Sequence, residues 1–443
     1  MENNMRIAIV GAGWYGCHMA LELSKLGVEV ILFEKSDKIF SGISGTFGIR
    51  LHAGPHYPRS EGTREYCHKN FRKFEDHYPE LVNHHKYSIY AIGNIDANGR
   101  PSKVSPEVFD KVCTEFQYKH RINPEEYGFR NLLTAHSLDE PSMSLGTPLR
   151  KYFVRLLENA NINVRYNVKV DDIEYDEDHA IINGQKFDYV INATSFKDLL
   201  PRATDLPQGI THIYQPCLAL VYEAKAEAQL TDPISFIAMD GWFPCLMPYL
   251  DGSDNQYILT HGKWTILDSC KKHSDAQSIL DSIDDEFVLQ NIKPPCEKEM
   301  LRFNPGFKKR FTFKGFKGSV IAKPVTNTEF RSAITFFEVN KKMIHIIPGK
   351  VSCIFSAFEE VLSIINKKDL VTDEKCKNFQ FANDGVLASH QQELKEKIED
   401  QQRNTCYLKN YTLFQNQKSP KLYTQFKPID NEMMFYALPA PRV

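Results

Sequence analysis

Residues 6–34 leave the chain few choices of fold. Arg6 to Val10 (RIAIV) is a short, continuous apolar run of the kind that forms a buried parallel strand. The segment Gly11-Ala12-Gly13-Trp14-Tyr15-Gly16 follows at once, and the helix-like run after it ends near Gly27. Val28 to Phe33 (VEVILF) predicts a second strand, which Glu34 closes. We therefore expect a β-α-β unit of about 30 residues at the start of a parallel sheet.

The G-x-G-x-x-G pattern of residues 11–16 predicts a dinucleotide site. Gly11 allows a tight turn, Gly13 lets a pyrophosphate approach the backbone, and Gly16 lets the helix pack close to the strand. The start of the helix presents free N–H groups and a positive dipole end to the anion. Glu34, which lies 23 positions after Gly11, can accept hydrogen bonds from a ribose diol. The alternative is a glycine-rich turn in an α/β protein that binds no dinucleotide.

Glycine is crowded into the N-terminal part of the chain. Nine of the 23 glycines in 443 residues fall within the first 62. Gly42, Gly45, Gly48 and Gly54 belong to a stretch, residues 35 to 62, that has no sustained period and is expected to form a long ordered loop. Close approach of a backbone to a flat ligand is a physical reason for so many glycines in one loop.

This second loop resembles that of the D-amino-acid-oxidase-like flavoproteins, a superfamily that includes glycine oxidase, sarcosine oxidase and glycerol-3-phosphate dehydrogenase. The similarity lies in Ser44-Gly45-Thr46 and Arg50. In that family the loop runs along the ribityl chain, the pyrophosphate and the flavin ring. The resemblance therefore implies FAD as the cofactor, where the β-α-β unit alone leaves NAD and FAD open.

Three later segments are similar to further cofactor segments of the same family. Val168 to Glu174 and Asn192-Ala193-Thr194-Ser195 correspond to the adenine end, and Pro348 to Ser352 to the turn that faces the flavin's pyrimidine edge. Ser195 stands where the family has glycine, and Gly349 alone represents a turn that is usually richer in glycine. The resemblance covers roughly residues 5 to 366.

The implied fold class is α/β: a Rossmann-type FAD-binding domain of the GR2 or D-amino-acid-oxidase type, with an antiparallel α+β substrate domain. The predicted FAD-binding domain is discontinuous, comprising residues 1–60, 145–205 and 330–366. The substrate or cap domain takes residues 61–144 and 206–329. Residues 367–443, which turn polar and rich in Lys, Gln and Asn, form a C-terminal extension of unassigned role.

Periodicity predicts elements beyond the first β-α-β unit. The predicted helices are residues 65–78, 148–159, 274–291, 351–365 and 391–402. The predicted strands are residues 164–175, 180–182, 188–194, 212–223, 235–250, 257–267 and 335–347, and Asn183-Gly184 signals a tight hairpin.

The resemblance places site residues in three groups. The cofactor-binding candidates are Gly11, Gly13, Trp14, Tyr15, Gly16, Glu34, Lys35, Ser44, Gly45, Thr46, Arg50, Val168, Ala193, Thr194, Gly349, Lys350 and Val351. The catalytic candidates are Arg50, His52, His261 and Lys350. The substrate-binding candidates are Tyr57, Tyr249, Trp264 and Arg331. An arginine is expected for a carboxylated substrate because its planar fork binds a carboxylate through two hydrogen bonds.

Each of these polar residues has a structural alternative. Arg50, His52, His56 and Tyr57 serve equally well as loop hydrogen-bonding residues, and Lys350 as a solvated lysine at a helix start. A histidine in this loop is also a possible covalent attachment point for flavin, as in some relatives. Cys353 invites the same idea, although an inert buried thiol is the commoner role.

Composition mainly excludes other functions. Lys and Arg number 54 against 56 Asp and Glu, a formal charge of −2, which gives no sign of a nucleic-acid partner. No uncharged apolar run approaches the ~18 residues of a membrane helix. Ten cysteines without a CxxC pair indicate cytosolic thiols and a cytoplasmic protein rather than a disulfide scaffold or a zinc site. No metal site is expected, since the adjacent His84 and His85 point apart. The sequence does not indicate an oligomeric state.

The leading hypothesis is an FAD-dependent oxidoreductase that removes a hydride from a carbon bearing an amine or hydroxyl on a small polar substrate. Flavin would carry the chemistry, and the protein would hold the substrate and tune charge. One alternative is an FAD enzyme without net oxidation, similar to UDP-galactopyranose mutase. Another is a catalytically inactive binding protein on a flavoprotein fold.

Overall fold

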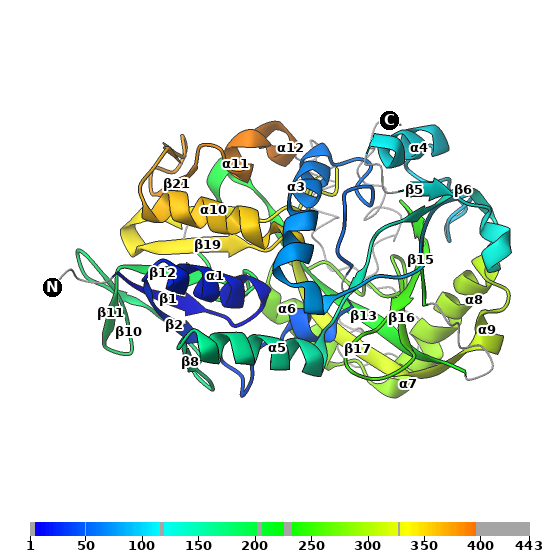
Figure 1. Ribbon diagram of the computed structural model, residues 1–443, viewed down its shortest axis with the longest axis horizontal. Helices are drawn as coiled ribbons and strands as arrows, with labels where there is room; N and C mark the ends of the chain where they lie inside the picture. Colours follow the sequence, from blue (N-terminus) through cyan, green and yellow to red (C-terminus); the bar gives the residue numbers. More distant parts are fainter. Residues whose placement is uncertain are drawn as a thin grey trace.

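Two eight-stranded sheets dominate the computed structural model, which describes residues 5–48, 50–115, 119–201, 206–225, 233–326 and 328–395. They lie side by side along the long axis of the molecule (Figure 1). The first sheet has the strand order β20-β21-β18-β19-β12-β1-β2-β8, and the second the order β17-β13-β16-β15-β14-β4-β6-β5.

The first sheet has a parallel centre and an antiparallel edge. Its parallel strands are β8 (Asn163–Arg165), β2 (Glu29–Phe33), β1 (Arg6–Val10), β12 (Tyr189–Asn192) and β19 (Met343–Ile347). Its antiparallel strands are β18 (Ile334–Glu338), β21 (Phe379–Ala382) and β20 (Leu370–Thr372). Val10 pairs with both Phe33 and Asn192, so the carboxyl ends of β1, β2 and β12 meet at one edge. Such an edge is where open α/β sheets bind ligands.

Alternation along β1 separates two apolar layers. Ile7 and Ile9 pack against four helices, whereas Ala8 and Val10 face a small sheet on the other side. The helices are α1 (Trp14–Lys25), α3 (Glu61–His77), α5 (Gly146–Asn159) and α10 (Ile354–Ile365). The small sheet consists of β9 (Glu174–Tyr175), β10 (Ala180–Ile182) and β11 (Gln185–Phe187). This double burial explains why β1 has an unbroken apolar sequence.

The second sheet forms the other half of the molecule and is built on a long strand pair. β13 (His212–Ala224) runs antiparallel to β17 (Phe311–Pro324) over thirteen registered pairs. Its remaining strands are β16 (Gln256–His261), β15 (Pro244–Pro248), β14 (Ile234–Met239), β4 (Tyr87–Gly93), β6 (Leu132–Leu138) and β5 (Lys119–Arg121). The predicted antiparallel pattern holds except between β14 and β4, which pair in parallel.

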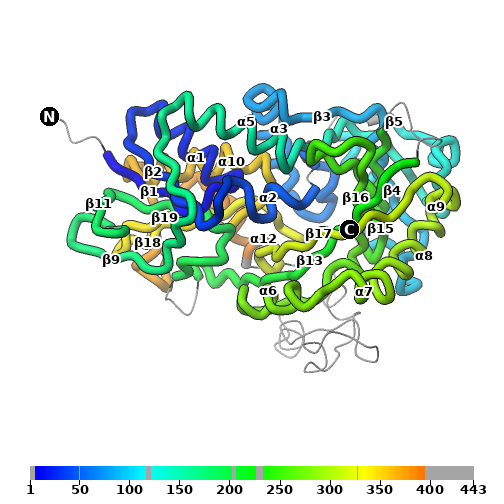
Figure 2. Tube along the Cα trace, turned by 90° about the horizontal axis from the view of Figure 1, so that it is seen from below, coloured from blue at the N-terminus to red at the C-terminus, as the bar shows by residue number. Residues whose placement is uncertain are grey.

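Shorter elements connect and cover these sheets. Those beside the second sheet are α4 (Pro106–Glu115), α6 (His273–Asp281), α7 (Asp285–Phe287), α8 (Lys293–Phe303) and α9 (Phe307–Arg310). A two-stranded ladder joins β3 (Val82–Asn83) to β7 (Ser142–Met143). Seen from below in Figure 2, the short helix α2 (Ile43–Thr46) lies between the two halves.

Four predicted strands are wrong in length. The segment 257–267 ends as β16 at His261, where the turn of residues 262–265 begins, and a turn interrupts each of the other three. The segment 164–175 is broken after β8, where Asn167 has φ +57°, and resumes only as β9. The segment 235–250 is the hairpin of β14 and β15, which turns at Asp240 with φ +86°. The segment 335–347 is the hairpin of β18 and β19, with Lys342 at φ +49°. In each case a non-glycine residue adopts the left-handed region, which sequence alone signals weakly.

The helix predictions hold better. Residues 65–78 and 148–159 lie in α3 and α5, and the helix predicted at 351–365 begins with the 3-10 turn η7 (Val351–Cys353) before α10. The insert at 274–291 is divided among α6, α7 and the π-helical turn η5 (Val288–Ile292). Of the helix predicted at 391–402, α12 (Gln391–Lys395) is described, and the rest lies outside the described residues.

The start of the predicted C-terminal extension is part of the first sheet. β21 pairs with β18, β20 pairs with β21, and α11 (Val386–Ser389) follows them. The division of the chain into domains stays a prediction. Within the described part of the chain, every helix is too short or too polar to cross a membrane.

Candidate active site

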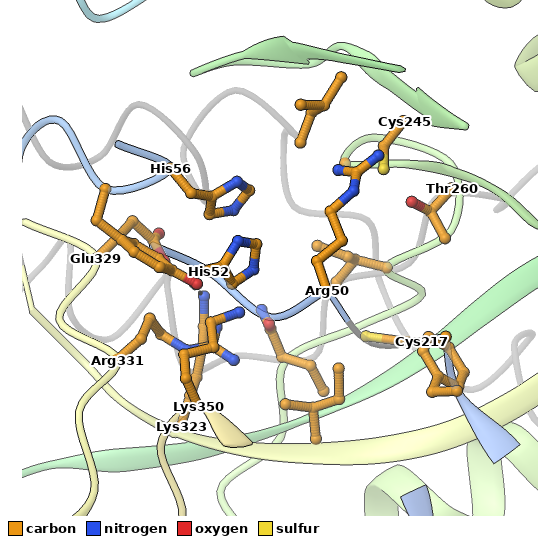
Figure 3. Close-up of a pocket in the computed structure, with 18 of the residues that line it drawn as sticks. Arg50, His52, His56, Cys217, Cys245, Thr260, Lys323, Glu329, Arg331 and Lys350 are labelled. Atoms are coloured by element: carbon orange, nitrogen blue, oxygen red, sulfur yellow. Dashed lines mark hydrogen bonds and ion pairs between the residues drawn. The ribbon is translucent and has the colours of Figure 1, made fainter. Parts of the chain in front are cut away.

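A cavity of about 540 Å³ lies between the two sheets. On the side of the first sheet it is lined by Trp14, Tyr15, Ser195 and residues 348–351. Residues 50–59 of the long loop form a second wall. Strands β13 to β17, residues 43–48 and residues 328–331 also contribute side chains to the lining. Figure 3 shows Arg50, His52 and His56 on the loop wall, with Lys323, Glu329, Arg331 and Lys350 grouped below His52.

The glycines of residues 11–16 are required by close contacts. Gly11 has φ +103°, and a Cβ there would lie 2.7 Å from the carbonyl oxygen of Ala193. A Cβ on Gly16 would lie 1.8 Å from the carbonyl oxygen of Gly11, which no side chain can accommodate. Gly13 is the N-cap residue of α1, and no side chain caps that helix. The first N–H groups of α1 are therefore available to an anion.

Glu34 lies at the carboxyl end of β2 and supports the same loop. Its Oε2 accepts a hydrogen bond from the Ala12 N–H at 2.9 Å, and its Oε1 accepts one from the Ser36 N–H at 3.0 Å. The Glu34 carbonyl accepts from the Val168 N–H at 3.0 Å, which brings Val168 beside it. Each carboxylate oxygen keeps acceptor capacity for a ribose hydroxyl. Lys35 instead points to the surface and forms an ion pair with Asp198.

Two other predicted cofactor residues, Trp14 and Thr194, are held mainly by the protein itself. The Trp14 side chain is 3% exposed and packs against Phe40, Phe74, Tyr78 and Phe153, so only its backbone and ring edge are near the cavity. Thr194 donates its hydroxyl hydrogen bond to Asn192 Oδ1 at 2.7 Å. The following residue, Ser195, adopts φ +60°. Serine thus adopts the left-handed backbone conformation that glycine accepts without strain, at a cost of about 1 kcal/mol.

Tyr15 ties the first glycine loop to the turn at residues 348–350. Its hydroxyl donates to the Lys350 carbonyl at 2.8 Å and accepts from the Gly349 N–H at 3.1 Å. A Cβ on Gly349 would lie 2.2 Å from the Ala333 backbone nitrogen, so the turn packs directly on that segment. Val351 then begins η7 and α10. Two segments more than 330 residues apart therefore form one surface of the cavity.

The second glycine loop lies on the opposite side of this surface. Ser44, Gly45 and Thr46 form α2, and a Cβ on Gly13 would meet Ser44 Oγ at 3.3 Å. Tyr249 donates its hydroxyl hydrogen bond to the Thr46 carbonyl at 2.8 Å. Tyr249 thus lies outside the cavity lining and holds the loop, whereas the sequence predicted a substrate contact.

Two further predicted residues take structural positions. Trp264 is absent from the cavity lining; it packs at the edge of the second sheet's core, with Lys263 Nζ 4.8 Å from its ring centre. Arg50 lines the cavity, but its guanidinium donates to Ser235 Oγ at 2.9 Å and to the carbonyls of Phe236 and Leu246 at 3.2 Å. These bonds attach the long loop to β14 and β15.

His52 belongs to a buried polar group that the sequence did not indicate. Its Nδ1 lies 3.0 Å from Glu140 Oε2, and the Tyr90 hydroxyl donates to the same oxygen. The Glu140 Oε1 accepts from the Ala53 N–H at 2.9 Å. Burial raises the pKa of Glu140 to about 7, against the opposing effect of these hydrogen bonds. Burial, Lys350, Arg50 and Arg331 hold the pKa of His52 well below its usual value, so its ring is neutral.

His56 stacks on His52. The two ring centres are 4.1 Å apart with an interplanar angle of 24°. Burial and the neighbouring His52 also lower the pKa of His56, and its Nδ1 has no hydrogen-bond partner among the described residues. The stack fixes the plane of the His52 ring. The Nε2 atom of His52 has no hydrogen-bond partner within the described structure.

His261 is the second predicted catalytic histidine that lines the cavity. The position of its proton makes it a hydrogen-bond donor toward the cavity rather than a base. Its Nδ1 accepts a hydrogen bond from the Lys263 N–H at 3.2 Å. Burial lowers its pKa to about 3, so the ring is neutral and its one proton sits on Nε2. That Nε2 is buried without a partner in the described structure. His261 is therefore equipped to donate a hydrogen bond into the cavity.

Three cations gather beside His52 (Figure 3). Lys323 Nζ lies 3.4 Å from Glu329, whereas the side chains of Lys350 and Arg331 make no hydrogen bond or ion pair with any described residue. Burial lowers the pKa of Lys350 to about 8, and its Nζ lies 5.2 Å from the ring centre of Tyr57. The buried Tyr57 hydroxyl also lacks a partner within the described structure. Unmatched buried donors of this kind call for an anionic ligand.

These features fit a bound FAD. An uncapped helix N-terminus for the pyrophosphate and an acidic strand end for the ribose lie behind the Trp14 and Tyr15 side of the cavity, and a half-buried cation lines it at the predicted flavin-facing turn. Gly11, Gly13, Gly16, Glu34, Val168, Ala193 and Gly349 would hold it through backbone approach and hydrogen bonds.

Away from the cavity, His18, Glu22 and His77 bring three potential metal-ligating atoms within 4.8 Å of one another. Glu22 Oε1 already accepts from Lys25 at 2.6 Å and from His77 at 3.0 Å. Ion pairing explains this group without a metal ion.

Comparison with known proteins places the chain in a class. Residues 6–108 match the family model described as FAD dependent oxidoreductase, and the chain belongs to this family of D-amino-acid-oxidase type. FAD is its cofactor and oxidation is its reaction class; neither the mutase-like alternative nor the inactive one is favoured.

Within that class the chain is 46% identical to the FAD-dependent monooxygenase kojA of Aspergillus flavus over 423 residues, which cover 93% of this chain and 98% of that one. The fold is similar to that of glycine oxidase from Geobacillus kaustophilus, with a TM-score of 0.58, 14% identity, and coverage of 82% and 96%. It is also similar to FAD-bound L-alpha-glycerophosphate oxidase from Mycoplasma pneumoniae, with a TM-score of 0.59, 16% identity, and coverage of 85% and 98%. These likenesses confirm the predicted family, fold class and cofactor.

Proposed function

We propose that the protein oxidises a small, anionic, polar substrate at a carbon that bears a hydroxyl or an amine. One observation carries the proposal: Lys350 and Arg331, two unpaired cations in the described structure, face the same cavity as the neutral, unpartnered Nε2 of His52. Such an oxidation requires two groups from the protein: one that binds the anion of the substrate and one that accepts a proton.

Substrate binding is assigned to the cations below His52. Lys350 and Arg331, which are both half-buried in the cavity lining, would hold a carboxylate or a comparable anion through charge-assisted hydrogen bonds that are stronger there than at the open surface. Lys323, which is already paired with Glu329, would contribute mainly positive potential. The Tyr57 hydroxyl supplies a further donor.

Proton transfer is assigned to His52. Its Nε2 would accept the proton of the substrate hydroxyl or ammonium, while Glu140 holds the opposite side of the ring. FAD, when bound, supplies the electron acceptor for this two-electron oxidation. His261 would orient a substrate oxygen by donating from Nε2, and Arg50 keeps the loop that carries His52 attached to the second sheet.

The test is a substrate screen that follows loss of flavin absorbance without oxygen. Carboxylated alcohols and amines are mixed with the purified holoenzyme, and matched uncharged amides or esters serve as controls. The proposal expects a carboxylated compound to bleach the flavin and its uncharged analogue to do so poorly. Equal bleaching by both would remove the role of Lys350 and Arg331.

A second candidate is insertion of one oxygen atom, which the printed function of the 46% identical relative favours. The two reactions can be distinguished by whether they need an external reductant and whether an atom of dioxygen enters the product. Oxidation at a hydroxyl- or amine-bearing carbon needs no external reductant and leaves no atom of dioxygen in the product. Monooxygenation needs an external two-electron reductant, NADH or NADPH for example, and places label from ¹⁸O₂ in the product.

The proposed surroundings follow from the same features. We propose a cytoplasmic protein that acts on small molecules and not on nucleic acid. The nine cysteines of the described part of the chain are all free thiols, which suits a reducing compartment.

A further inference from the structure

We propose that Glu140 is a positioning residue that keeps the proton of His52 on Nδ1, so that the Nε2 lone pair faces the cavity. Nothing in the 132–143 region signals such a role in the sequence, since Glu140 follows β6 as one acidic residue among several in the chain. The inference concerns the state of the His52 ring, and its use in catalysis rests on the proposed function.

The carboxylate of Glu140 is surrounded by donors. Glu140 is 1% exposed and comes from the segment between β6 and β7, whereas Tyr90 comes from β4 and His52 from the long loop. Oε1 accepts from the Ala53 N–H, and Oε2 accepts from the Tyr90 hydroxyl and faces His52 Nδ1. A carboxylate only accepts hydrogen bonds, so Nδ1 must carry the proton that points at it. In a neutral imidazole Nε2 is then unprotonated.

The ring is neutral and has little freedom to turn. His56 stacks on one face of the His52 ring, and Tyr57 meets the ring edge at a centre distance of 5.5 Å. Lys350, Arg50 and Arg331 disfavour a second proton on His52. The ring therefore stays in place while the hydrogen-bond partner at Nδ1 determines which nitrogen is protonated.

The backbone N–H of Ala53 makes the Glu140→Gln variant unusually informative. It requires an acceptor at the Oε1 position, so the amide oxygen of Gln must occupy that position. The amide NH₂ group then replaces Oε2, where it meets His52 Nδ1 as a donor. His52 is forced to accept at Nδ1 and to move its proton to Nε2. The same reversal occurs when an amide replaces the carboxylate of a catalytic triad.

Tyr90→Phe is the matched control. It removes one hydrogen bond to the same carboxylate oxygen and a 3.4 Å contact between the Tyr90 hydroxyl and His52 Nδ1, but the carboxylate stays an acceptor. The inference expects Tyr90→Phe to leave the proton of His52 on Nδ1. Because both variants disturb the same buried group, a general loss of packing would affect them alike.

The experiment is nitrogen NMR of the FAD-loaded enzyme labelled with ¹⁵N-histidine. Spectra are recorded at pH 8.5, where the Glu140 carboxylate is ionised, and the His52 signals are assigned with His52→Gln. Wild type and Tyr90→Phe should show a protonated Nδ1 and an unprotonated Nε2, and Glu140→Gln should show the reverse. An Nε2-protonated ring in wild type, or no change in Glu140→Gln, would overturn the inference.

A chemical probe gives a second readout that needs no substrate. Diethyl pyrocarbonate acylates an unprotonated imidazole nitrogen, and tandem mass spectrometry of the peptide Leu51–Arg59 separates His52 from His56. His52 should be acylated at least about tenfold more slowly in Glu140→Gln than in Tyr90→Phe, since the accessible nitrogen is protonated only in the former. Equal rates in the two variants would contradict the inference.

The outcomes separate the inference from the proposed function. If no compound bleaches the flavin but the NMR signals of His52 reverse in Glu140→Gln, the proposed function fails and the role of Glu140 stands. If a carboxylated compound bleaches the flavin while His52 keeps one tautomer in all variants, the function stands and this inference fails.

Discussion

The two walls of the cavity are built in different ways. The wall formed by Trp14, Tyr15 and residues 348–351 rests on the glycine turn of residues 11–16, and the backbone shapes it through an uncapped helix start, tight turns and close approaches that leave no room for side chains. The wall around His52 works through side chains: Glu140, Tyr90 and Arg50 come from separate segments and meet by tertiary packing. A cofactor common to many proteins is held by backbone features, whereas the chemistry toward one substrate lies in an arrangement of side chains.

The largest effect is expected from a side chain at Gly16. Gly16→Ala puts a Cβ 1.8 Å from the Gly11 carbonyl oxygen, so the first turn of α1 must shift. Loss of the glycine loop geometry should abolish FAD retention, which the ratio of flavin to protein absorbance measures. Gly306→Ala is the control, because Gly306 lies outside the cavity lining and its Cβ would make only ordinary contacts, the nearest 3.5 Å from Asn304 Oδ1, so the FAD should stay bound. Equal FAD content in the two variants would show that the backbone wall tolerates side chains.

A smaller effect, confined to the substrate, is expected at Lys350. Lys350→Met removes a buried cation without a partner in the described structure, and a lost charge-assisted hydrogen bond of about 1.5–3 kcal/mol should raise KM for a carboxylated substrate by roughly 10- to 150-fold. FAD content should persist, since Gly349 and Val351 keep their backbone contacts. Lys350→Arg should recover part of the loss. A fall in kcat with unchanged KM would instead indicate that Lys350 acts on the cofactor.

The side-chain wall should also set the pH dependence. Glu140, with a pKa of about 7, must be ionised to hold the His52 proton, so kcat/KM should rise with pH through about 7. Lys350, with a pKa of about 8, loses its charge above that value, so kcat/KM should fall again. FAD affinity should stay flat across this range. A rising limb that persists unchanged in Glu140→Gln would assign it to another group.

A modest effect is expected where the two glycine segments join. Tyr15→Phe removes the hydrogen bonds to Gly349 and Lys350, each worth about 1 kcal/mol, so the free energy of unfolding should fall by about 1–2 kcal/mol. Denaturant unfolding of the holoenzyme measures this change. An unchanged free energy of unfolding would indicate that packing alone holds the 348–350 turn against α1.

The smallest effect is expected at Tyr249. Tyr249→Phe frees the Thr46 carbonyl and should cost about 1 kcal/mol of stability while KM stays unchanged, since this side chain lies outside the cavity lining. A marked change in KM would restore the substrate role that the sequence suggested.

The same contrast explains what could be predicted from the sequence. Local rules located residues 11–16, Glu34 and α1, because spacing and strand composition express backbone requirements directly. The 348–351 turn could be placed only by resemblance, since Gly349 is needed for a contact with Ala333 that no local pattern shows. Glu140 and Tyr90 could not be found: their role depends on three segments meeting, and neither residue type is unusual in its local sequence.

Some predicted site residues lie close to the cavity, but their position or their hydrogen-bonding role differs from the predicted one. Tyr249 lies just after β15 and Trp264 lies in the turn after β16, so the alternation of the predicted strands does not set the direction of either side chain. His261 lines the cavity as predicted, but a backbone N–H from Lys263 makes it a donor rather than a base. Alternation along a strand gives two faces, and only the register decides which face meets the cavity.

The central claim is that one wall of the cavity binds FAD and that the other supports the reaction with the substrate. One paired measurement on Glu140→Gln tests this claim most directly. The dissociation constant for FAD and the rate of anaerobic flavin reduction are determined on the same preparation, with a compound that bleaches the wild-type flavin. We expect unchanged FAD affinity and reduction slower by about 10²-fold or more, the usual contribution of a proton acceptor. FAD affinity that falls in step with the rate, or a rate equal to that of wild type, would contradict the account.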